Sequence, residues 1–360
     1  MSSIKVTNLQ APSAASPAIV LASDGSATAQ LSSLNGGALS GMRNKIINGN
    51  FDVWQRGTSF TLSTSFQYTV DRWRAKVGTG GAGSITRNVS SGDGNPYLTF
   101  AITTAGTGSH ELSQPIEFVR SVSGTGGAST SVTVSMRVAR TSGTGTLDVS
   151  LLQYFGSGGS PSASVSLSLG TITPTSTSTL YSLTGTLASI TGKTFGSNND
   201  DQLVLIITPS NAVASYDFAS VQVEPGSVAT PFERRSYGQE LALAQRYYYR
   251  ISSSAASGNY CKYGQAFASA TTNYNAQIFF PVPMRSSPTL DASTTSGSAG
   301  SGFCVWDSTS DLGVTSLTVD QASRETISLF CTVSGAVQYR TGVLQSFNNK
   351  TSYIGFSAEL

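Results

Sequence analysis

One histidine is the first residue to consider for chemistry, because histidine is the commonest general acid–base catalyst. His110 is followed by Glu111 in a stretch of strand-like composition. A histidine base needs a positioning partner and a nucleophile, and the sequence contains no GxSxG elbow to supply the nucleophile. Phosphate-binding loops, GxGxxG fingerprints and EF-hand loops are also absent from the sequence. We therefore interpret His110 as a surface or edge-strand residue and expect that the chain is not an enzyme.

Paired carboxylates are the second chemistry to consider, because most glycosidases use two Asp or Glu side chains. Asp93, Asp307, Asp311 and the pair Asp200-Asp201 stand in expected loops, where two of them could form such a pair. Aspartate is also a common turn former, since its side chain accepts hydrogen bonds from nearby backbone amides. The turn-forming role is the favoured interpretation, and a glycan-depolymerising tailspike stays open as an alternative function.

A polar run of four residues offers oxygen ligands of the kind that calcium prefers. Calcium needs about six or more oxygens from converging groups, which is more than one short segment supplies. A structural calcium ion therefore remains an open hypothesis, and no other cofactor is expected. The candidate ligands are Asn198, Asn199, Asp200 and Asp201.

Aromatic and amide residues in the last third of the chain are candidates for ligand contact. Sugars have apolar faces and polar edges, so their sites combine flat rings with Asn, Asp, Gln or Arg. The run Asn273-Tyr274-Asn275 before an apolar stretch is most typical of a contact loop. Packing in a core or between subunits is the more frequent role of an aromatic residue in a β-domain. The receptor-binding candidates are Tyr260, Tyr263, Asn273, Tyr274, Asn275, Trp306, Asp307, Tyr339 and Arg340.

Composition excludes several classes of protein. The chain has 360 residues, of which 39% are hydrophobic and 11% charged, and its net charge is +2. This composition suits two domains with cores and argues against a disordered or a nucleic-acid-binding protein. No apolar run approaches the roughly 20 residues of a membrane span, and the N-terminus lacks a signal-peptide pattern. We expect folding in the cytoplasm, no membrane insertion, and buried thiols at Cys261, Cys304 and Cys331, which lack metal-ligand spacing.

Short β-rich runs divide the chain into an arm and two domains. Residues 1–41 have too little apolar surface for a core, and residues 36–41 are a glycine-rich hinge candidate. About eight antiparallel strands with Gly- and Ser-rich turns predict a jelly-roll β-sandwich over residues 42–235. A second β-domain is expected over residues 250–360, with an exposed, mobile loop at 293–301. The expected strands are 46–53, 97–103, 131–138, 147–154, 165–169, 203–208 and 215–223, then 266–268, 276–282, 303–306, 325–332, 337–340 and 353–358.

One helix is predicted between the domains, over residues 236–249. Ser236 and Gln239 fit a capping box, in which each side chain reaches the backbone amide of the other. Apolar residues follow at spacings of 4, 3 and 4, as in a coiled coil. The stripe could pack on a flanking domain or against identical helices around a trimer axis, and the spacing leaves both open. The residues assigned to an oligomer interface are Tyr237, Leu241, Ala244 and Tyr248.

Several segments resemble phage tail fibre or receptor-binding proteins that carry a carbohydrate-binding-module-like jelly roll. The matching stretches are NKIINGNFDVWQR at 44–56, YTVDRW at 68–73, FASVQVEPGSVATPFE at 218–233, LALAQRYY at 241–248 and the ending YIGFSAEL. The likeness covers most of residues 44–250 and the C-terminal edge. Two departures are Pro225, where the family often has a second acidic residue, and Ala244, where it often has cysteine.

The resemblance implies a function as well as a fold. It implies a homotrimeric tail fibre on a virion that is assembled in the host cytoplasm. Residues 1–41 would attach it to a tail or baseplate protein, and residues 250–360 would form a tip that binds a host cell-surface polysaccharide without catalysis. A collar or adaptor protein that holds another fibre is the remaining alternative.

Overall fold

The computed structural model describes residues 8–9, 19–21, 27–29, 42–123, 125–253, 260–293, 302–349 and 351–360. In these ranges the chain is nearly all β, with one α-helix and two short 3-10 helices, η1 (Val119–Val122) and η2 (Thr125–Gly127). None of the described helices has the length and apolar character needed to cross a bilayer. The expected hinge at 36–41 and most of the loop at 293–301 lie outside the described residues.

Within the N-terminal arm the structure describes three short antiparallel strands, which pair in the order β1-β2-β3. Their bounds are β1 (Asn8–Leu9), β2 (Ile19–Leu21) and β3 (Ala27–Ala29).

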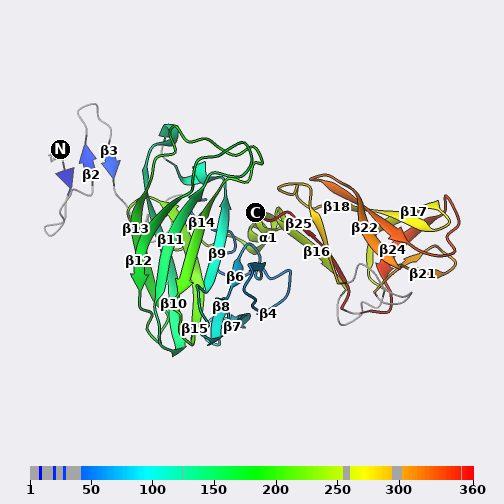
Figure 1. The fold of residues 1–360 in the computed structure, drawn as a ribbon, viewed down its shortest axis with the longest axis horizontal. Coiled ribbons are helices and arrows are strands. Elements are labelled where there is room, and N and C mark those ends of the chain that lie inside the picture. The colour runs from blue at the N-terminus through cyan, green and yellow to red at the C-terminus, as the bar shows by residue number, and fades with distance from the viewer. Residues whose placement is uncertain are drawn as a thin grey trace, which may run out of the picture.

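Residues from Met42 to Pro225 form a jelly-roll sandwich of two six-stranded antiparallel sheets (Figure 1). The first sheet has the order β13-β10-β15-β8-β7-β4 and the second β12-β11-β14-β9-β6-β5. Alternating apolar residues of both sheets fill the space between them, which confirms the predicted fold class. The strands are β4 (Ser59–Thr61), β5 (Gln67–Tyr68), β6 (Arg74–Lys76), β7 (Ala82–Val89), β8 (Pro96–Thr104), β9 (Glu111–Glu117), β10 (Thr130–Gly143), β11 (Leu147–Tyr154), β12 (Val165–Ile172), β13 (Thr179–Leu187), β14 (Gln202–Pro209) and β15 (Ala214–Pro225).

The expected strand at 46–53 is wrong, because this segment is a buried loop. Asn48 and Phe51 have positive φ angles, which a strand does not allow. The loop is held against β15 by two backbone hydrogen bonds, from Lys45 to the Val223 carbonyl and from Val221 to the Gly49 carbonyl, each 2.8 Å. Strands β7, β9 and β13 were missed by the sequence reasoning because their Gly, Ser, Thr and Pro residues weaken the apolar alternation.

The motif VQVE at the end of β15 is buried on both faces. Val221 and Val223 point into the core, and Gln222 and Glu224 are also fully buried. Residues 226–235, here called the return segment, supply their partners: Glu224 accepts hydrogen bonds from the Thr230 amide at 2.8 Å and from its hydroxyl at 2.7 Å. The same carboxylate pairs with Arg43 at 3.1 Å. The return segment therefore folds back over the outer surface of β15.

Helix α1 (Tyr237–Gln245) begins one residue after the predicted start, with Ser236 as its N-cap, and ends four residues earlier than expected. The Ser236 hydroxyl accepts a hydrogen bond from the Gln239 amide at 3.4 Å, whereas the Gln239 side chain reaches Met42 instead of completing the capping box. Tyr248 lies in the following strand, not in the helix.

The predicted coiled-coil stripe does not exist as one helical face. Ala244 and Tyr248 are buried within a single chain, while Tyr237 is 60% exposed. The reason is that the chain leaves the helix at Arg246 and pairs β16 with β25. The assignment of Ala244 and Tyr248 to an oligomer interface is therefore wrong, because both side chains are buried within one chain.

The C-terminal unit contains a three-stranded sheet, β16-β25-β19, and a seven-stranded sheet, β21-β20-β24-β17-β18-β23-β22. The expected strand at 337–340 is wrong, because Tyr339 has a positive φ in a turn and the strand begins one residue later. Cys304 and Cys331 are buried as predicted, Cys261 is partly exposed, and burial raises the pKa of both buried thiols to about 12. The strands are β16 (Tyr248–Ser252), β17 (Lys262–Ala270), β18 (Asn273–Phe279), β19 (Thr289–Ala292), β20 (Phe303–Trp306), β21 (Asp311–Gly313), β22 (Ser316–Ala322), β23 (Thr326–Thr332), β24 (Thr341–Ser346) and β25 (Tyr353–Ser357).

The C-terminus lies between the two units, beside α1 (Figure 1). Glu359 forms ion pairs with Arg72 and Arg56, both of the jelly roll. The Tyr68 hydroxyl donates to the Leu360 carbonyl at 2.7 Å. Arg246, at the end of the helix, pairs with Glu117 of β9 at 2.8 Å. The last residues of the chain thus join the two units.

Candidate functional site

Two of the predicted contact tyrosines belong to the core of the C-terminal unit. Tyr263 and Tyr274 are almost completely buried. The Tyr263 hydroxyl lies 2.8 Å from the Ser352 hydroxyl, and Tyr274 packs against apolar side chains of the same sheet. Their assignment as receptor contacts is therefore wrong, because alternation along β17 and β18 turns both rings inward.

The ion pair between Asp307 and Arg340 stabilises a loop. Their side chains are 2.9 Å apart, and Asp307 also accepts hydrogen bonds from the Thr309 hydroxyl at 2.6 Å and from the Ser310 amide at 2.9 Å. Burial opposes the charged form, yet these hydrogen bonds hold the pKa of Asp307 well below its usual range. The neighbouring Tyr339 is 81% exposed.

The other candidates are spread over the unit. Trp306 is 43% exposed, with the Lys262 ammonium 5.5 Å from its ring. Tyr260 is equally exposed but packs edge-on against Phe347, at the opposite end of β24. Asn273 accepts a hydrogen bond from the Ser269 hydroxyl. Of the nine candidates, Trp306, Asn273 and Asn275 lie on one surface of the seven-stranded sheet.

That surface, here called the aromatic face, also carries residues that sequence reasoning missed. Cross-strand register places Trp306, Val343, Gln265, Gln277 and Ser328 side by side in one row. The adjacent row contains Phe267 opposite Asn275, and Phe279 follows two residues beyond Gln277. The aromatic face is defined by Gln265, Phe267, Asn275, Gln277, Phe279 and Trp306.

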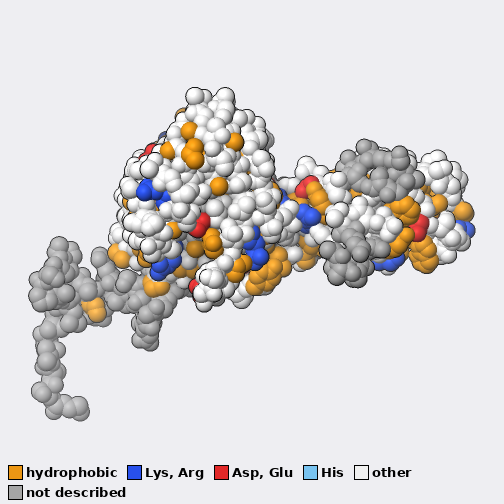
Figure 2. Space-filling view, turned by 90° about the horizontal axis from the view of Figure 1, so that it is seen from below, with side chains coloured by type: hydrophobic (Ala, Val, Ile, Leu, Met, Phe, Trp, Pro, Cys, Tyr) orange, Lys and Arg blue, Asp and Glu red, His pale blue; other side chains and the backbone are white. Residues whose placement is uncertain are grey.

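The aromatic face is apolar for a surface exposed to water. Phe279 is 70% and Phe267 46% exposed. Figure 2 shows exposed hydrophobic side chains on the C-terminal unit, with acidic and basic side chains beside them. The signal was present in the sequence: alternation along β17 and β18 leaves Gln, Phe, Asn, Gln and Phe on the side opposite the buried Ala, Tyr and Ile residues.

A cavity of about 450 Å³ opens on the aromatic face between Phe267 and Phe279. Asn275 and Gln277 line it together with Asp320, which among the described residues is its one charged lining residue. The Asp320 carboxylate accepts hydrogen bonds from the Asn275 amide at 3.4 Å and the Ser328 hydroxyl at 3.2 Å. The cavity therefore presents two rings, amide groups and hydroxyls, which suits a ligand with both apolar faces and hydroxyl groups.

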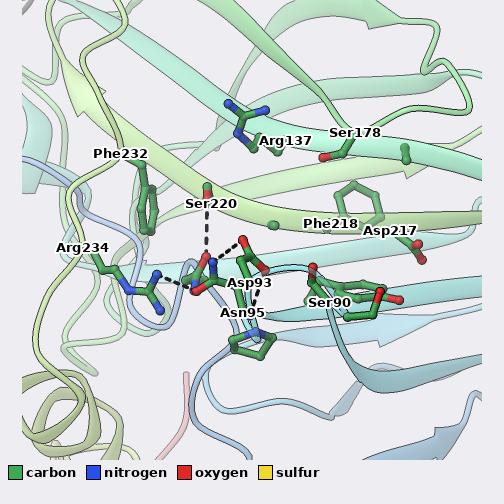
Figure 3. A pocket seen from close by; sticks show the side chains of 16 residues that line it. Ser90, Asp93, Asn95, Arg137, Ser178, Asp217, Phe218, Ser220, Phe232 and Arg234 are labelled. Atoms are coloured by element: carbon green, nitrogen blue, oxygen red, sulfur yellow. Dashed lines mark hydrogen bonds between the residues drawn. The ribbon is translucent and has the colours of Figure 1, made fainter.

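The jelly roll has a larger and more polar cleft of about 660 Å³ (Figure 3). Strands β8, β10 and β15 form its floor, and the return segment contributes Phe232 and Arg234 at one side. Arg234 donates to the Asn95 side chain at 2.7 Å, and Asn95 donates to Asp93 at 2.6 Å. A second carboxylate, Asp217, accepts a hydrogen bond from Thr99 at 2.6 Å, and burial raises its pKa.

The proposed calcium ligands are engaged within the jelly roll. Asp200 accepts hydrogen bonds from the Ser157 amide and hydroxyl, whereas Asp201 accepts one from the Val119 amide at 3.0 Å. The Asn198 amide donates to Ser157, and Asn199 has a positive φ in the turn. The two carboxylates therefore serve separate hydrogen-bond sets, and the part of the chain that the structure describes contains no group of three acidic, His or Cys residues that could hold a metal.

His110 is buried, so its assignment to the surface is wrong. Its Nδ1 accepts a hydrogen bond from the Gly78 amide at 3.2 Å, which leaves the proton on Nε2, 3.0 Å from the Asn211 side-chain oxygen. Both ring nitrogens are occupied by these structural contacts.

Asp71 of the YTVDRW motif is a buried carboxylate that we expect to make stability depend on pH. It accepts two hydrogen bonds from Gln55, each 2.6 Å. Burial raises its pKa to about 6, although Arg56 and Gln55 oppose the shift. Because the folded pKa exceeds the unfolded value, the protonated form favours folding. This stabilisation, about 3 kcal/mol, is complete below about pH 4 and is lost as the pH rises through 6.

The matched variant for this prediction is Asp71→Asn, which cannot titrate. Chemical unfolding of both proteins between pH 4 and pH 8 should show the wild type losing about 3 kcal/mol relative to the variant. Parallel stability curves across this range would contradict the prediction.

Comparison with known proteins finds no matching family model and no matching curated protein. Among solved structures, the enzymatically active domain of bacteriophage CBA120 tailspike protein 4 has a TM-score of 0.31 at 10% identity, covering 53% of this chain and 22% of that one. The CBM22-1 and GH10 modules of Clostridium thermocellum xylanase 10B, complexed with xylohexaose, have a TM-score of 0.31 at 12% identity, covering 54% and 30%. The CBM22-1 xylan-binding domain of Paenibacillus barcinonensis Xyn10C has a TM-score of 0.29 at 17% identity, covering 47% and 95%.

Proposed function

We propose that this protein is a non-catalytic adhesion fibre of a bacterial virus, which attaches the virion to a polysaccharide on the host surface. The aromatic face of the C-terminal unit is the observation that carries the proposal. The viral assignment rests on the resemblance of the jelly-roll motifs and of the ending YIGFSAEL to tail fibre proteins.

The chemistry of the aromatic face matches a sugar chain. The rings of Phe267 and Phe279 offer apolar surfaces for the C–H faces of pyranose rings. Asn275 and Gln277 stand between them and can each donate to and accept from hydroxyl groups. Such contacts are individually weak, and the homotrimer that the resemblance implies would multiply them, since further sites bind at high effective concentration once one is engaged.

The two ends of the chain have different roles in the proposal. Residues 1–41 anchor the fibre to a tail or baseplate protein, and the jelly roll is the stem that carries the C-terminal unit. The ion pairs of Glu359 hold that unit to the stem, so a force on the bound polysaccharide is transmitted to the virion through these contacts.

The double variant Phe267→Ala and Phe279→Ala is expected to bind host-envelope polysaccharide at least tenfold more weakly, because it removes both stacking surfaces. Virions that carry it should assemble normally and adsorb poorly to host cells. Leu180→Ala is the matched control, since Leu180 is also a largely exposed apolar residue but lies on the edge strand β13 of the jelly roll. Unchanged adsorption by the double variant would refute the assignment of the aromatic face. Deletion of residues 250–360 should abolish adsorption too, but it also uncovers Arg56 and Arg72, so the point variants are the sharper test.

A glycan-depolymerising tailspike is the second candidate, and the jelly-roll cleft is the observation that favours it. Asp93 and Asp217 both line that cleft. The hydrogen bonds of Asn95 lower the pKa of Asp93 whereas burial raises that of Asp217, a difference that glycosidases use between base and acid. New reducing ends after incubation of the purified chain with host polysaccharide would establish this function in place of simple adhesion.

A further inference from the structure

A third cavity, of about 390 Å³, lies where the jelly roll and the C-terminal unit meet; it is here called the junction cavity. Both units contribute to its walls, so it exists only in the joined protein. Its lining residues are Arg56, Phe60 and Tyr68 from the jelly roll, and Tyr248, Arg250, Asp291, Tyr353 and Ser357 from the C-terminal unit.

Two arginines of the junction cavity lie over tyrosine rings. The Arg56 guanidinium lies 3.6 Å from the ring centre of Tyr248 and 5.3 Å from that of Tyr68. The Arg250 guanidinium lies 3.6 Å from the ring centre of Tyr353. Stacking fixes each planar group while its N–H donors remain in the plane, which is the geometry that recognises a carboxylate.

The hydrogen bonds of these arginines are incomplete. Arg56 Nη2 pairs with Glu359 at 3.2 Å, but Nη1 is buried and has no partner among the described residues. A buried donor without a partner is unfavourable, so the positive charge of Arg56 is only partly satisfied by Glu359.

Arg250 is also left without an ionic partner. It donates to the Ser252 hydroxyl and to the Arg56 carbonyl, each at 2.8 Å. The nearby carboxylate of Asp291 accepts instead from the hydroxyls of Tyr248, at 2.7 Å, and Tyr353, at 3.4 Å. Among the described residues, the ion pairs of the protein do not include Arg250.

We propose that the junction cavity is a second binding site, which takes an acidic sugar through its carboxylate. The carboxylate pairs with Arg250 beside the positive charge of Arg56, the apolar face of the sugar ring lies against Phe60 and Tyr353, and the Ser357 hydroxyl and Asp291 meet its hydroxyl groups. The volume is within the range of small-ligand sites, which favour domain interfaces. An acidic sugar held there contacts both units and strengthens their joint.

Titration calorimetry of the full chain with D-galacturonate and with D-galactose tests the proposal, since the two probes differ by one carboxylate. Galacturonate is expected to bind at least tenfold more tightly than galactose. Arg250→Gln should weaken galacturonate binding at least tenfold, whereas Arg87→Gln, which removes an exposed arginine of β7, should leave it unchanged. Ser357→Phe occupies the cavity while both arginines are retained and should also abolish binding, which keeps the test valid if Arg250→Gln proves unstable.

Three results would overturn the proposal. Equal binding of galactose would remove the role of the carboxylate, and unchanged binding in a folded Arg250→Gln or Ser357→Phe variant would place the sugar elsewhere. Inorganic phosphate as a third probe should bind more weakly than galacturonate; equal affinity would identify a general oxyanion site instead of a sugar site. None of these variants alters the aromatic face, so failure here leaves the proposed adhesion function intact.

Discussion

Replacing Glu359 with alanine is expected to lower the free energy of unfolding by about 3 to 5 kcal/mol, the usual cost of removing one partner from a buried ion pair. Glu359 pairs with Arg72, which is almost completely buried, and with Arg56, of which about one-tenth is exposed. The remaining contacts of Arg72, a hydrogen bond to the Pro115 carbonyl and stacking on Tyr247, do not neutralise its charge. The variant therefore leaves two arginine charges buried at the junction.

The expected loss of stability should appear as independent unfolding of the two units. Calorimetry of the wild type should show coupled unfolding of the jelly roll and the C-terminal unit, and the Glu359→Ala variant should unfold in two resolved transitions at lower temperature. Glu325→Ala is the control, because Glu325 is an exposed carboxylate of the same unit. A loss below 1 kcal/mol with a single transition would show that the junction does not depend on Glu359.

Gly49→Ala is expected to destabilise the jelly roll by about 3 kcal/mol, through steric overlap and a lost hydrogen bond. A Cβ atom at this position would lie 2.2 Å from the Val221 carbonyl oxygen and 3.2 Å from Ile46 Cγ2. The backbone cannot move away freely, because the Gly49 carbonyl accepts the Val221 amide at 2.8 Å. The variant would thus separate the loop at 44–50 from β15.

Gly238→Ala is the matched control for the same substitution. Gly238 lies in α1, where a new Cβ atom meets no heavy atom within 4 Å. Alanine has a higher helix propensity than glycine, so this variant should gain up to about 1 kcal/mol. Chemical unfolding of the two variants should therefore give opposite signs, and a similar loss in both would contradict the steric explanation.

These predictions depend on contacts between segments that are distant in the sequence. The motifs at 44–56 and 218–233 resemble the same protein family, and the structure shows why they occur together. Asn44 accepts the Val223 amide and donates to the Val221 carbonyl, while Glu233 accepts the amides of Met42 and Asn44. These hydrogen bonds join the start of the jelly roll to its end. The residue pattern within either segment does not predict this contact.

The candidate site could be predicted only in part. Trp306 and Asn275 were identified from their residue types, and both lie on the aromatic face. The assignment of Tyr263 and Tyr274 as receptor contacts was wrong. Alternation divides the residues of a strand between two sides, but it does not show which side is covered by a second layer. Phe267 and Phe279 were missed for the same reason, since an apolar residue in a strand is normally assigned to the core.

Strand alternation, turn residues and the Ser236 cap are enough to predict the all-β class, the jelly roll, the start of the connecting helix and two β-regions. Each of these signals lies within a few positions along the chain. The end of that helix, the burial of Tyr263 and Tyr274, and the joining of the two units by Glu359 could not be predicted in this way. These features arise from pairings across the chain, such as β16 with β25 and Glu359 with Arg72, whose energies depend on burial. Burial is a property of the assembled layers and not of any local run of residues.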